Sequence, residues 1–253
     1  MKIKLAFLAI GLTLGFSACK PDDPKPDDNN SGDVNAKVTM KFDCKFGATA
    51  TDWTKFYETA SGDTIMFDKV KYLLSKFILE KENGELVPIA NSYAYLSMKD
   101  GRDSVILSGV PKGKYKSIRF TVGLDSNINH SDPAQWGLDH PLSPSLNEMH
   151  WGWAGGYIFN VIEGYYKKNG ANAGFSFHAA LDKNVRTHVY NVNFEVSGNG
   201  RFVFNNQLDK HFNNIINYSI KNDGAFSHSA DVDPVMDKFM QNMNGIFEFV
   251  SYK

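Results

Sequence analysis

Hydrophobic and polar residues alternate along most of the chain, which is the period expected of half-buried strands. The cleanest run covers residues 36–46, where one face collects Val38, Met40, Phe42, Cys44 and Phe46. Further strands are expected at residues 72–80, 86–89, 92–98, 104–107, 115–124, 157–163, 174–181, 188–196 and 201–204. Short strands separated by turn residues are typical of a sandwich or a barrel, so the pattern predicts a mainly β fold, an antiparallel β-sandwich.

Turn residues indicate how some of these strands pair. Three hairpins are expected: 72–80 with 86–89, 157–163 with 174–181, and 188–196 with 201–204. The first is marked by Asn83 and Gly84, a strong hairpin turn signal. The third turns around the glycine-rich residues 197–200.

Helix is scarce, and one short helix is expected near the C-terminus. Asp233 can cap it, with Pro234 at its first position. Its apolar stripe consists of Val235, Met236, Phe239, Met240 and Met243. These methionines are expected to fill the core rather than to bind a soft metal.

The segment 125–147 is predicted to be a loop, longer than a compact domain usually carries without a function. Its acidic side chains, between Asp125 and Asp139, offer the hard oxygen ligands that Ca²⁺ prefers. A Ca²⁺ site in this loop is therefore one expectation, and simple solvation of the acids is the alternative.

Residues 1–18 have the pattern of a targeting segment. Lys2 and Lys4 precede an apolar run over 5–16, which is too short and too early for a spanning helix. The run ends in Phe-Ser-Ala-Cys19, which resembles a bacterial lipobox. Cleavage before Cys19 and acylation of its sulfur are expected, which would attach the protein to a membrane. The alternative is an ordinary secretory signal with an incidental cysteine.

A tether is expected at residues 19–35, followed by a single domain at 36–253. Residues 20–33 contain no apolar residue other than three prolines, so they cannot bury enough surface to become ordered. A lysine and an acidic pair directly after Cys19 resemble an export signal for surface lipoproteins. The expected location is the outer membrane, facing either the periplasm or the cell surface.

The charge, the motifs and the cysteine content exclude several classes of function. The formal net charge is −1 and there is no basic stripe, so nucleic acid is not expected as a partner. No serine-hydrolase, zinc-protease, phosphate-loop or Cys-x-x-Cys motif is present, so the protein is not expected to be an enzyme. Cys44 is the only cysteine besides Cys19, and its place on an apolar face predicts a buried, inert thiol.

Residues 149–157 form the most unusual segment of the chain. These nine residues hold a methionine, a histidine, three glycines and two of the four tryptophans: Met149, His150, Trp151 and Trp153 are the chemically interesting ones. Glycine allows tight turns and close approach, so a built site is one interpretation. An aromatic loop that fills the end of the sandwich is the other.

The segment resembles the signature of the MbnP family of secreted copper-binding proteins, to which MopE and CorA are related. The motifs that match are Gly123-Leu124-Asp125, Leu138-Asp139-His140-Pro141, the block 149–157, Glu163-Gly164, and the later histidines His178 and His228. The inserted His140 departs from the family pattern. The resemblance extends over residues 36–253 and implies a protein that binds copper, expected as Cu(I). Together with the lipobox-like end of residues 1–18, it predicts a lipid-anchored member of the family.

The same resemblance implies particular site residues. His178 and His228 match the ligand histidines of the family best. His150 is a candidate only because it is adjacent to Trp151 in the sequence. Trp151 or Trp153 would be the indole that a dihaem partner related to cytochrome c peroxidase oxidises, and Met149 would line the site. Imidazole and thioether donors suit Cu(I).

Strand geometry raises an objection to this site. In a simple hairpin, His178 faces about residue 160, which leaves Trp153 about 23 Å away along the strand. The site therefore requires the glycine-rich segment to fold back. Otherwise His228 and His150 would form the site and His178 would be structural.

Three functions compete at this point. The favoured one is a lipid-anchored, extracytoplasmic protein for copper capture or handling, with an oxidisable tryptophan near the metal. The alternative is a cell-surface glycan- or ligand-binding lipoprotein in which Trp136, Trp151 and Trp153 form a stacking platform. A weaker third is a tryptophan that serves only as a redox substrate of a haem peroxidase.

Overall fold

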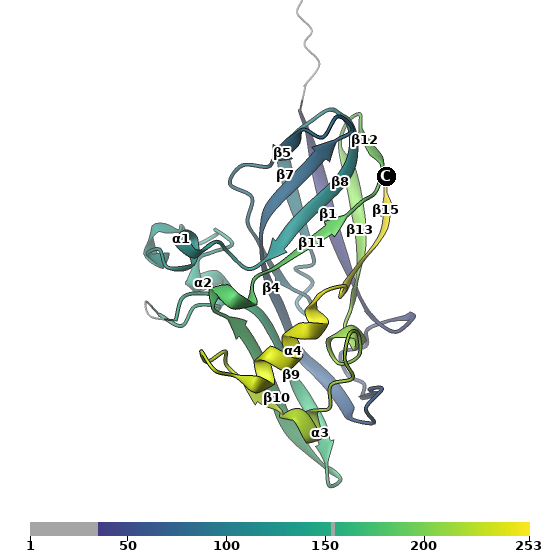
Figure 1. Cartoon of the computed structure of the whole chain (residues 1–253), viewed down its shortest axis with the longest axis vertical. Coiled ribbons are helices and arrows are strands. Elements are labelled where there is room, and N and C mark those ends of the chain that lie inside the picture. Colours follow the sequence, from purple (N-terminus) through teal and green to yellow (C-terminus); the bar gives the residue numbers. More distant parts are fainter. Residues whose placement is uncertain (1–34, 153–154) are drawn as a thin grey trace, which may run out of the picture. The chain divides into compact units, whose positions relative to one another are not determined.

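The strands form two sheets in the computed structural model, which describes residues 35–152 and 155–253 (Figure 1). The smaller sheet runs β15 (Phe247–Tyr252), β13 (Gly200–Gln207), β1 (Asn35–Phe46) and β2 (Thr49–Ala50), with β7 (Ser104–Pro111) also on β1. The larger sheet runs β11 (Arg186–Tyr190), β8 (Gly113–Val122), β4 (Thr64–Lys81), β9 (Ile158–Lys168), β10 (Ala171–Ala180) and β14 (Phe226–Ser227). Four short strands complete it: β12 (Phe194–Val196) on β8, and β3 (Tyr57–Glu58), β5 (Leu86–Pro88) and β6 (Ala94–Ser97) on β4.

Helices are short and lie between the strands. The α-helices are α1 (Ser126–Asn129), α2 (Pro144–Asn147), α3 (Ile220–Asp223) and α4 (Pro234–Phe239). The 3₁₀ turns are η1 (Pro133–Gln135), η2 (Asp182–Asn184), η3 (Asp209–His211) and η4 (Met240–Met243). The predicted fold, a β-sandwich with one short C-terminal helix, is confirmed. Two strand pairs, β1 with β13 and β10 with β14, are parallel, so both sheets are mixed.

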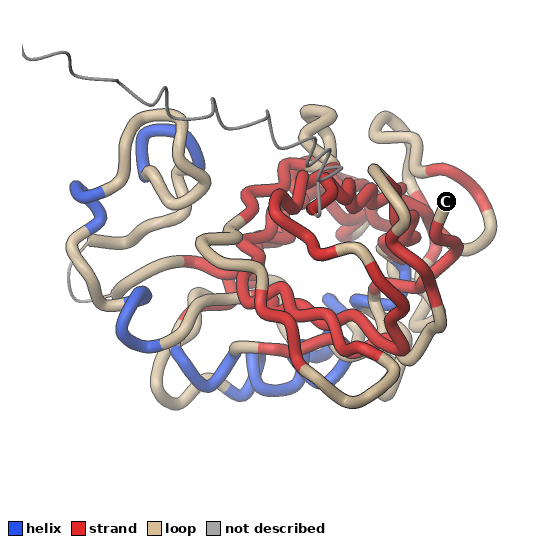
Figure 2. Tube along the Cα trace, turned by 90° about the horizontal axis from the view of Figure 1, so that it is seen from above, coloured by secondary structure: helices blue, strands red, loops and turns tan. Residues whose placement is uncertain are grey.

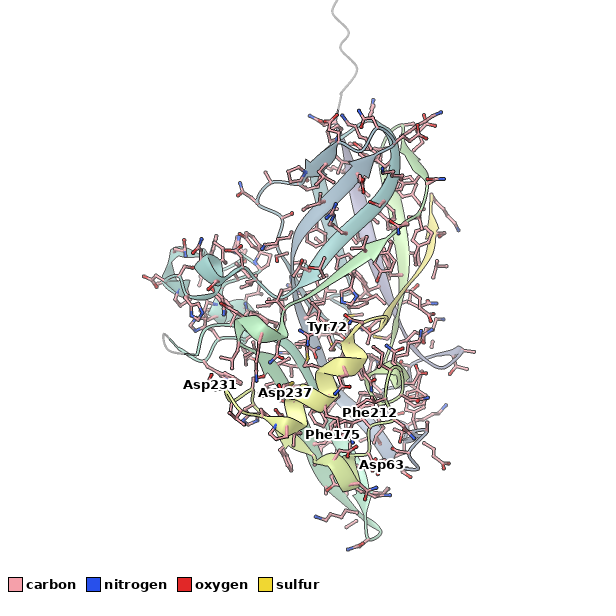
Figure 3. The ribbon with its side chains drawn as sticks, in the orientation of Figure 1. Asp63, Tyr72, Phe175, Phe212, Asp231 and Asp237 are labelled. Atoms are coloured by element: carbon pink, nitrogen blue, oxygen red, sulfur yellow. The ribbon has the colours of Figure 1, made fainter. Side chains whose placement is uncertain are left out.

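The core lies between the two sheets, and the strands surround it when the molecule is seen from above (Figure 2). Phe42 of the smaller sheet packs edge-on against Phe120 of the larger one, with ring centroids 5.7 Å apart. Farther along, Phe175 of β10 meets Phe212 edge-on at 5.9 Å (Figure 3). Phe212 in turn contacts Phe239 of α4 at 5.9 Å, so aromatic packing joins the helix to the larger sheet.

The C-terminal helix follows its predicted design. Asp233 caps α4, and its side chain accepts a hydrogen bond from the backbone N–H of Met236 at 2.8 Å. Met236, Met240 and Met243 are buried in the core, which confirms their expected packing role.

Strand β4 is longer than predicted and organises the larger sheet. Its first half pairs with β9 and its second half with β8. The prediction found only the second half, because a bulge between Phe67 and Lys69 breaks the alternation of the first.

The predicted hairpin of 188–196 with 201–204 is wrong. Strand β12 pairs with β8 in the larger sheet, whereas β13 pairs with β1 and β15 in the smaller one. In this position Phe204 stacks on Phe42, with centroids 5.4 Å apart, and both rings are buried. The turn between β12 and β13 therefore carries the chain from one sheet to the other.

The N-terminal predictions lie outside the described residues. They are the signal peptide at 1–18, the acylated Cys19, and the tether up to residue 34. Within 35–152 and 155–253, no helix has the length and apolar character needed to cross a membrane.

Candidate metal-binding site

Two of the predicted ligands, His178 and His228, lie side by side. Strand β14 runs parallel to β10 with Ser176 opposite Phe226 and Phe177 opposite Ser227. The next position along both strands brings the two histidines together, and their ring centroids are 4.8 Å apart with the planes inclined at 16°. Backbone pairing thus joins two histidines that are far apart in sequence.

The serines on either side of His228 hold its backbone in place. The hydroxyl of Ser227 donates to Asp233 at 2.6 Å, and the hydroxyl of Ser229 donates to the backbone carbonyl of His178 at 2.8 Å. Both serines are buried while the His228 side chain is exposed. Ser229 has a left-handed backbone, with φ of 57°, which ends the strand pairing directly after the histidine.

Trp151 lies beside both histidines because its segment folds back on itself. His150 pairs with Tyr157 in an isolated antiparallel bridge, and the backbone N–H of Trp151 donates to the carbonyl of Gly156 at 3.0 Å. The indole centroid is 6.1 Å from that of His178 and 6.0 Å from that of His228. The site required the glycine-rich segment to fold back, and this fold-back brings Trp151 to the histidines. The side chain of Trp151 remains 40% exposed.

The segment 125–147 supplies the support for this fold-back. Asn129, which ends α1, is fully buried, and its side-chain oxygen accepts from the backbone N–H of Tyr157 at 2.8 Å. Gly156 has φ of 65°, and a Cβ placed there would lie 2.6 Å from the same oxygen. Only glycine therefore fits at this position without moving Asn129.

The remaining candidates of the segment lie in different surroundings. His150 packs edge-on against Tyr157, and its Nδ1 accepts from the backbone N–H of Gly152 at 2.9 Å. Burial lowers the pKa of His150. Met149 is fully buried in the hydrophobic core. Trp153 lies outside the described residues.

Glu163 is a site residue whose role was not recognised from the sequence. Its carboxylate is 2.6 Å from Nε2 of His178, and its other oxygen is 3.0 Å from Nζ of Lys69. Burial lowers the pKa of His178 and outweighs the opposing effect of Glu163. Burial alone would raise the pKa of Glu163, but hydrogen bonds from His178 and Lys69 lower it overall. The carboxylate of Glu163 thus lies between the imidazole of His178 and the ammonium group of Lys69. The only sequence signal was the Glu-Gly pair of the family motif.

No acidic cluster is formed in the segment that was expected to bind Ca²⁺. Asp125 accepts from the backbone N–H of Ile128 at 3.2 Å, and Asp132 accepts from that of Ala134 at 2.8 Å, so both cap helical turns. Asp139 is exposed. Across the described part of the chain, no three histidine, cysteine, aspartate or glutamate side chains are grouped around a common point.

The other tryptophan of the proposed platform lies in a separate cluster. Trp136 stacks on His140, with centroids 4.2 Å apart, and both rings contact Tyr93 at 5.8 Å. The inserted histidine is thus used in aromatic packing. Cys44 is partly buried, and burial raises the pKa of its thiol to about 12, which agrees with the expected inert cysteine.

The fold and the site together describe a sandwich-like β domain in which two histidines lie side by side next to an indole. The model of one family, MbnP, matches residues 35–229, which is most of the chain, so this chain belongs to the MbnP family. Among solved structures it is similar to MbnP from Methylosinus trichosporium, with a TM-score of 0.52 and 17% sequence identity. That match covers 70% of this chain and 77% of the other, and at this identity it shows a shared fold. No protein with a curated description matches the chain.

Proposed function

We propose that this protein is a lipid-anchored, extracytoplasmic binding protein that captures or handles copper as Cu(I). His178 and His228 would be the ligands, and the indole of Trp151 would lie beside the ion. The observation that carries the proposal is the stacked pair of imidazoles, 4.8 Å between centroids, with Trp151 about equally far from both. His228 is exposed and the His178 side chain is 17% exposed, so an ion would approach the pair from the side of His228.

The donor set fits copper better than the other common metals. Ca²⁺ takes six to eight oxygen ligands and structural zinc usually has four protein ligands, whereas the described residues bring two imidazoles to this point. The nearest carboxylate, that of Glu163, is occupied by His178 and Lys69. Imidazole suits copper, and the polarisable indole is compatible with a soft ion.

The same geometry makes Trp151 the indole that we propose for oxidation. It is exposed enough for a large partner to approach, and it contacts both histidines. A dihaem enzyme related to cytochrome c peroxidase would insert oxygen into the indole while peroxide is reduced to water. Mass spectrometry of the peptide covering residues 149–157 should show the added oxygen when that enzyme is present, and fragmentation should assign it to Trp151 rather than Trp153.

The proposed copper site is tested by metal analysis and by affinity. Protein purified from its own host should carry copper, and a competition titration with Cu(I) should give tight binding. His178→Ala and His228→Ala should each weaken binding at least tenfold, which corresponds to about 1.4 kcal/mol. His130→Ala is the matched control, because His130 is exposed and lies near Asp182, 3.6 Å away, rather than near the pair.

Two results would contradict this assignment in different ways. Protein without copper, with no binding tighter than micromolar and with unmodified tryptophans, would rule out the copper function and favour a ligand-binding surface protein. Copper binding that survives His178→Ala unchanged would instead move the ligand role to His150.

A further inference from the structure

Four side chains form a row across four adjacent strands of the larger sheet. Lys69 of β4 is opposite Glu163 of β9, and Glu163 is opposite Ser176 of β10. His178 is two residues beyond Ser176 and therefore on the same face. His228, directly after β14, completes the row beside His178. The row leads from an ammonium group through a carboxylate to the two imidazoles.

The hydrogen bonds within this row determine which nitrogen of His178 carries a proton. Nε2 lies 2.6 Å from a carboxylate oxygen of Glu163 and 3.1 Å from the hydroxyl of Ser176. Because the other oxygen of Glu163 pairs with the ammonium group of Lys69, the group acts as a carboxylate that only accepts, so Nε2 is the donor. In a neutral imidazole the other nitrogen, Nδ1, then keeps its lone pair. None of the hydrogen bonds among the described residues uses this Nδ1.

The carboxylate itself is held in a fixed orientation. Its second oxygen is 3.0 Å from Nζ of Lys69, and the Glu163 side chain is only 23% exposed. Because both carboxylate oxygens already have partners within the row, Glu163 is not oriented to bind an ion directly. Its position suits a residue that acts through His178.

From this arrangement we infer that Glu163 is a positioning residue, which holds His178 as its Nε2–H tautomer and thereby presents Nδ1 to Cu(I). Lys69 supports it by orienting the carboxylate. The inference rests on the proposed copper function for the identity of the ion. Carboxylates that hydrogen-bond to metal-bound histidines fix the ring and raise its basicity, and their loss typically weakens binding ten- to a hundredfold.

The tautomer can be measured without any metal. Long-range ¹H–¹⁵N correlation spectra of the metal-free protein should show the Nε2–H form of His178 alone. Glu163→Ala should give a mixture of both tautomers, and Glu163→Gln, which keeps an acceptor at the same distance and preserves the fold, should give a smaller change. Because Cu(I) is diamagnetic, the same spectra of the loaded protein should show the Nδ1 resonance shifting while Nε2 keeps its proton.

Affinity supplies the second measurement, with a matched control. Glu163→Ala should bind Cu(I) ten- to a hundredfold more weakly than the parent, and Glu163→Gln should lie between them. Glu80→Ala is the control, since Glu80 also pairs with a lysine and a serine on the sheet, Lys116 and Ser117, and contacts neither histidine of the pair. It should leave both the tautomer and the affinity unchanged.

The outcomes separate this inference from the copper function. An Nδ1–H tautomer in the metal-free parent, or spectra and affinity that Glu163→Ala leaves unchanged, would overturn the positioning role. If the parent shows the Nε2–H form and Glu163→Ala disturbs it, but no variant binds Cu(I), the tautomer assignment stands while the role toward copper and the proposed function both fail.

Discussion

His178 of β10 lies beside His228, which follows directly after the parallel, two-residue strand β14, at the position next to the pair Phe177 and Ser227. The short strand is held by contacts outside the ladder, chiefly the hydrogen bond from the hydroxyl of Ser227 to Asp233. Asp233 also caps α4. The position of one proposed ligand is therefore coupled to the start of the C-terminal helix.

This coupling predicts that Asp233→Ala damages both the fold and the site. Loss of the cap and of the bond to Ser227 should lower the free energy of unfolding by about 1–2 kcal/mol. Because the backbone around His228 loosens, Cu(I) affinity should also fall severalfold. Urea unfolding and a Cu(I) titration measure the two effects. Asp237→Ala is the control on the same helix (Figure 3), because its exposed carboxylate pairs with Lys183 alone among the described residues.

Gly156 is predicted to be required for the position of Trp151. In Gly156→Ala the new Cβ would meet Asn129, and the fold-back that brings the indole to the histidines would shift. Stability should fall by about 1–3 kcal/mol, and Cu(I) should bind severalfold more weakly. Gly152 has a similar backbone, with φ of 85°, but a Cβ placed there would meet no atom of the described residues within 4 Å. A Gly152→Ala variant that weakens copper binding as much as Gly156→Ala would show that strain, and not the displaced indole, is responsible.

Gly164 has a different role, although it also belongs to the family motif. A Cβ at this position would lie 2.0 Å from the backbone oxygen of Met66 and 2.8 Å from the ring of Phe175. The strand cannot move away because it is paired on both sides, so Gly164→Ala should cost about 3 kcal/mol in urea unfolding. Gly174→Ala, across the same hairpin with open space around it, should cost less than about 1 kcal/mol. Equal losses in the two variants would refute the steric explanation.

The sequence predicted those parts of the fold that depend on local pattern. The alternation at 36–46, the turn at Asn83 and Gly84, and the cap at Asp233 each specify an element through its own residues. Alternation states which face of a strand is buried but not which strand lies beside it. For this reason the parallel pairing of β1 with β13 was missed and a hairpin was predicted instead.

The candidate site was only partly predictable for the same reason. His178 and His228 were chosen through the family motif, but their contact depends on a two-residue strand that has no sequence signature. Glu163 was visible in the motif, yet its partners His178 and Lys69 come from two other strands. In the sequence, Asn129 is one of several polar residues of the segment 125–147. Only the folded structure shows that it lies against Gly156.

Membrane attachment through Cys19 is a separate prediction, based on the apolar run and the lipobox-like end of residues 1–18. The parent should fractionate with membranes and incorporate a labelled fatty acid. Cys19→Ala should give a soluble or unprocessed protein without the label. Cys44→Ala is the matched control, since this thiol is partly buried on β1 and should remain unacylated. Normal processing and membrane fractionation of Cys19→Ala would contradict the lipoprotein assignment.

Two buried histidines should make the protein sensitive to mild acid. Burial lowers the pKa of His188 to about 4 and that of His211 to about 3, whereas an exposed histidine titrates near 6.5. His188 stacks on Phe120, and Nε2 of His211 hydrogen-bonds with the hydroxyl of Tyr72 at 2.8 Å. Both imidazoles are therefore neutral in the folded protein at pH values where the unfolded chain already binds protons.

The direction of the pH effect follows from these depressed pKa values. The free energy of unfolding should have its full value above pH 6.5 and should fall as the pH drops from 6.5 toward 4. In this range the two histidines bind protons in the unfolded chain but not in the folded protein. Each histidine contributes a slope of about 1.4 kcal/mol per pH unit. Urea unfolding of the parent between pH 6.5 and 4.5 should show both contributions. His188→Phe, which keeps the stack on Phe120, should reduce the slope of the parent by about 1.4 kcal/mol per pH unit. Equal slopes for the parent and His188→Phe would show that His188 is not held neutral by the fold.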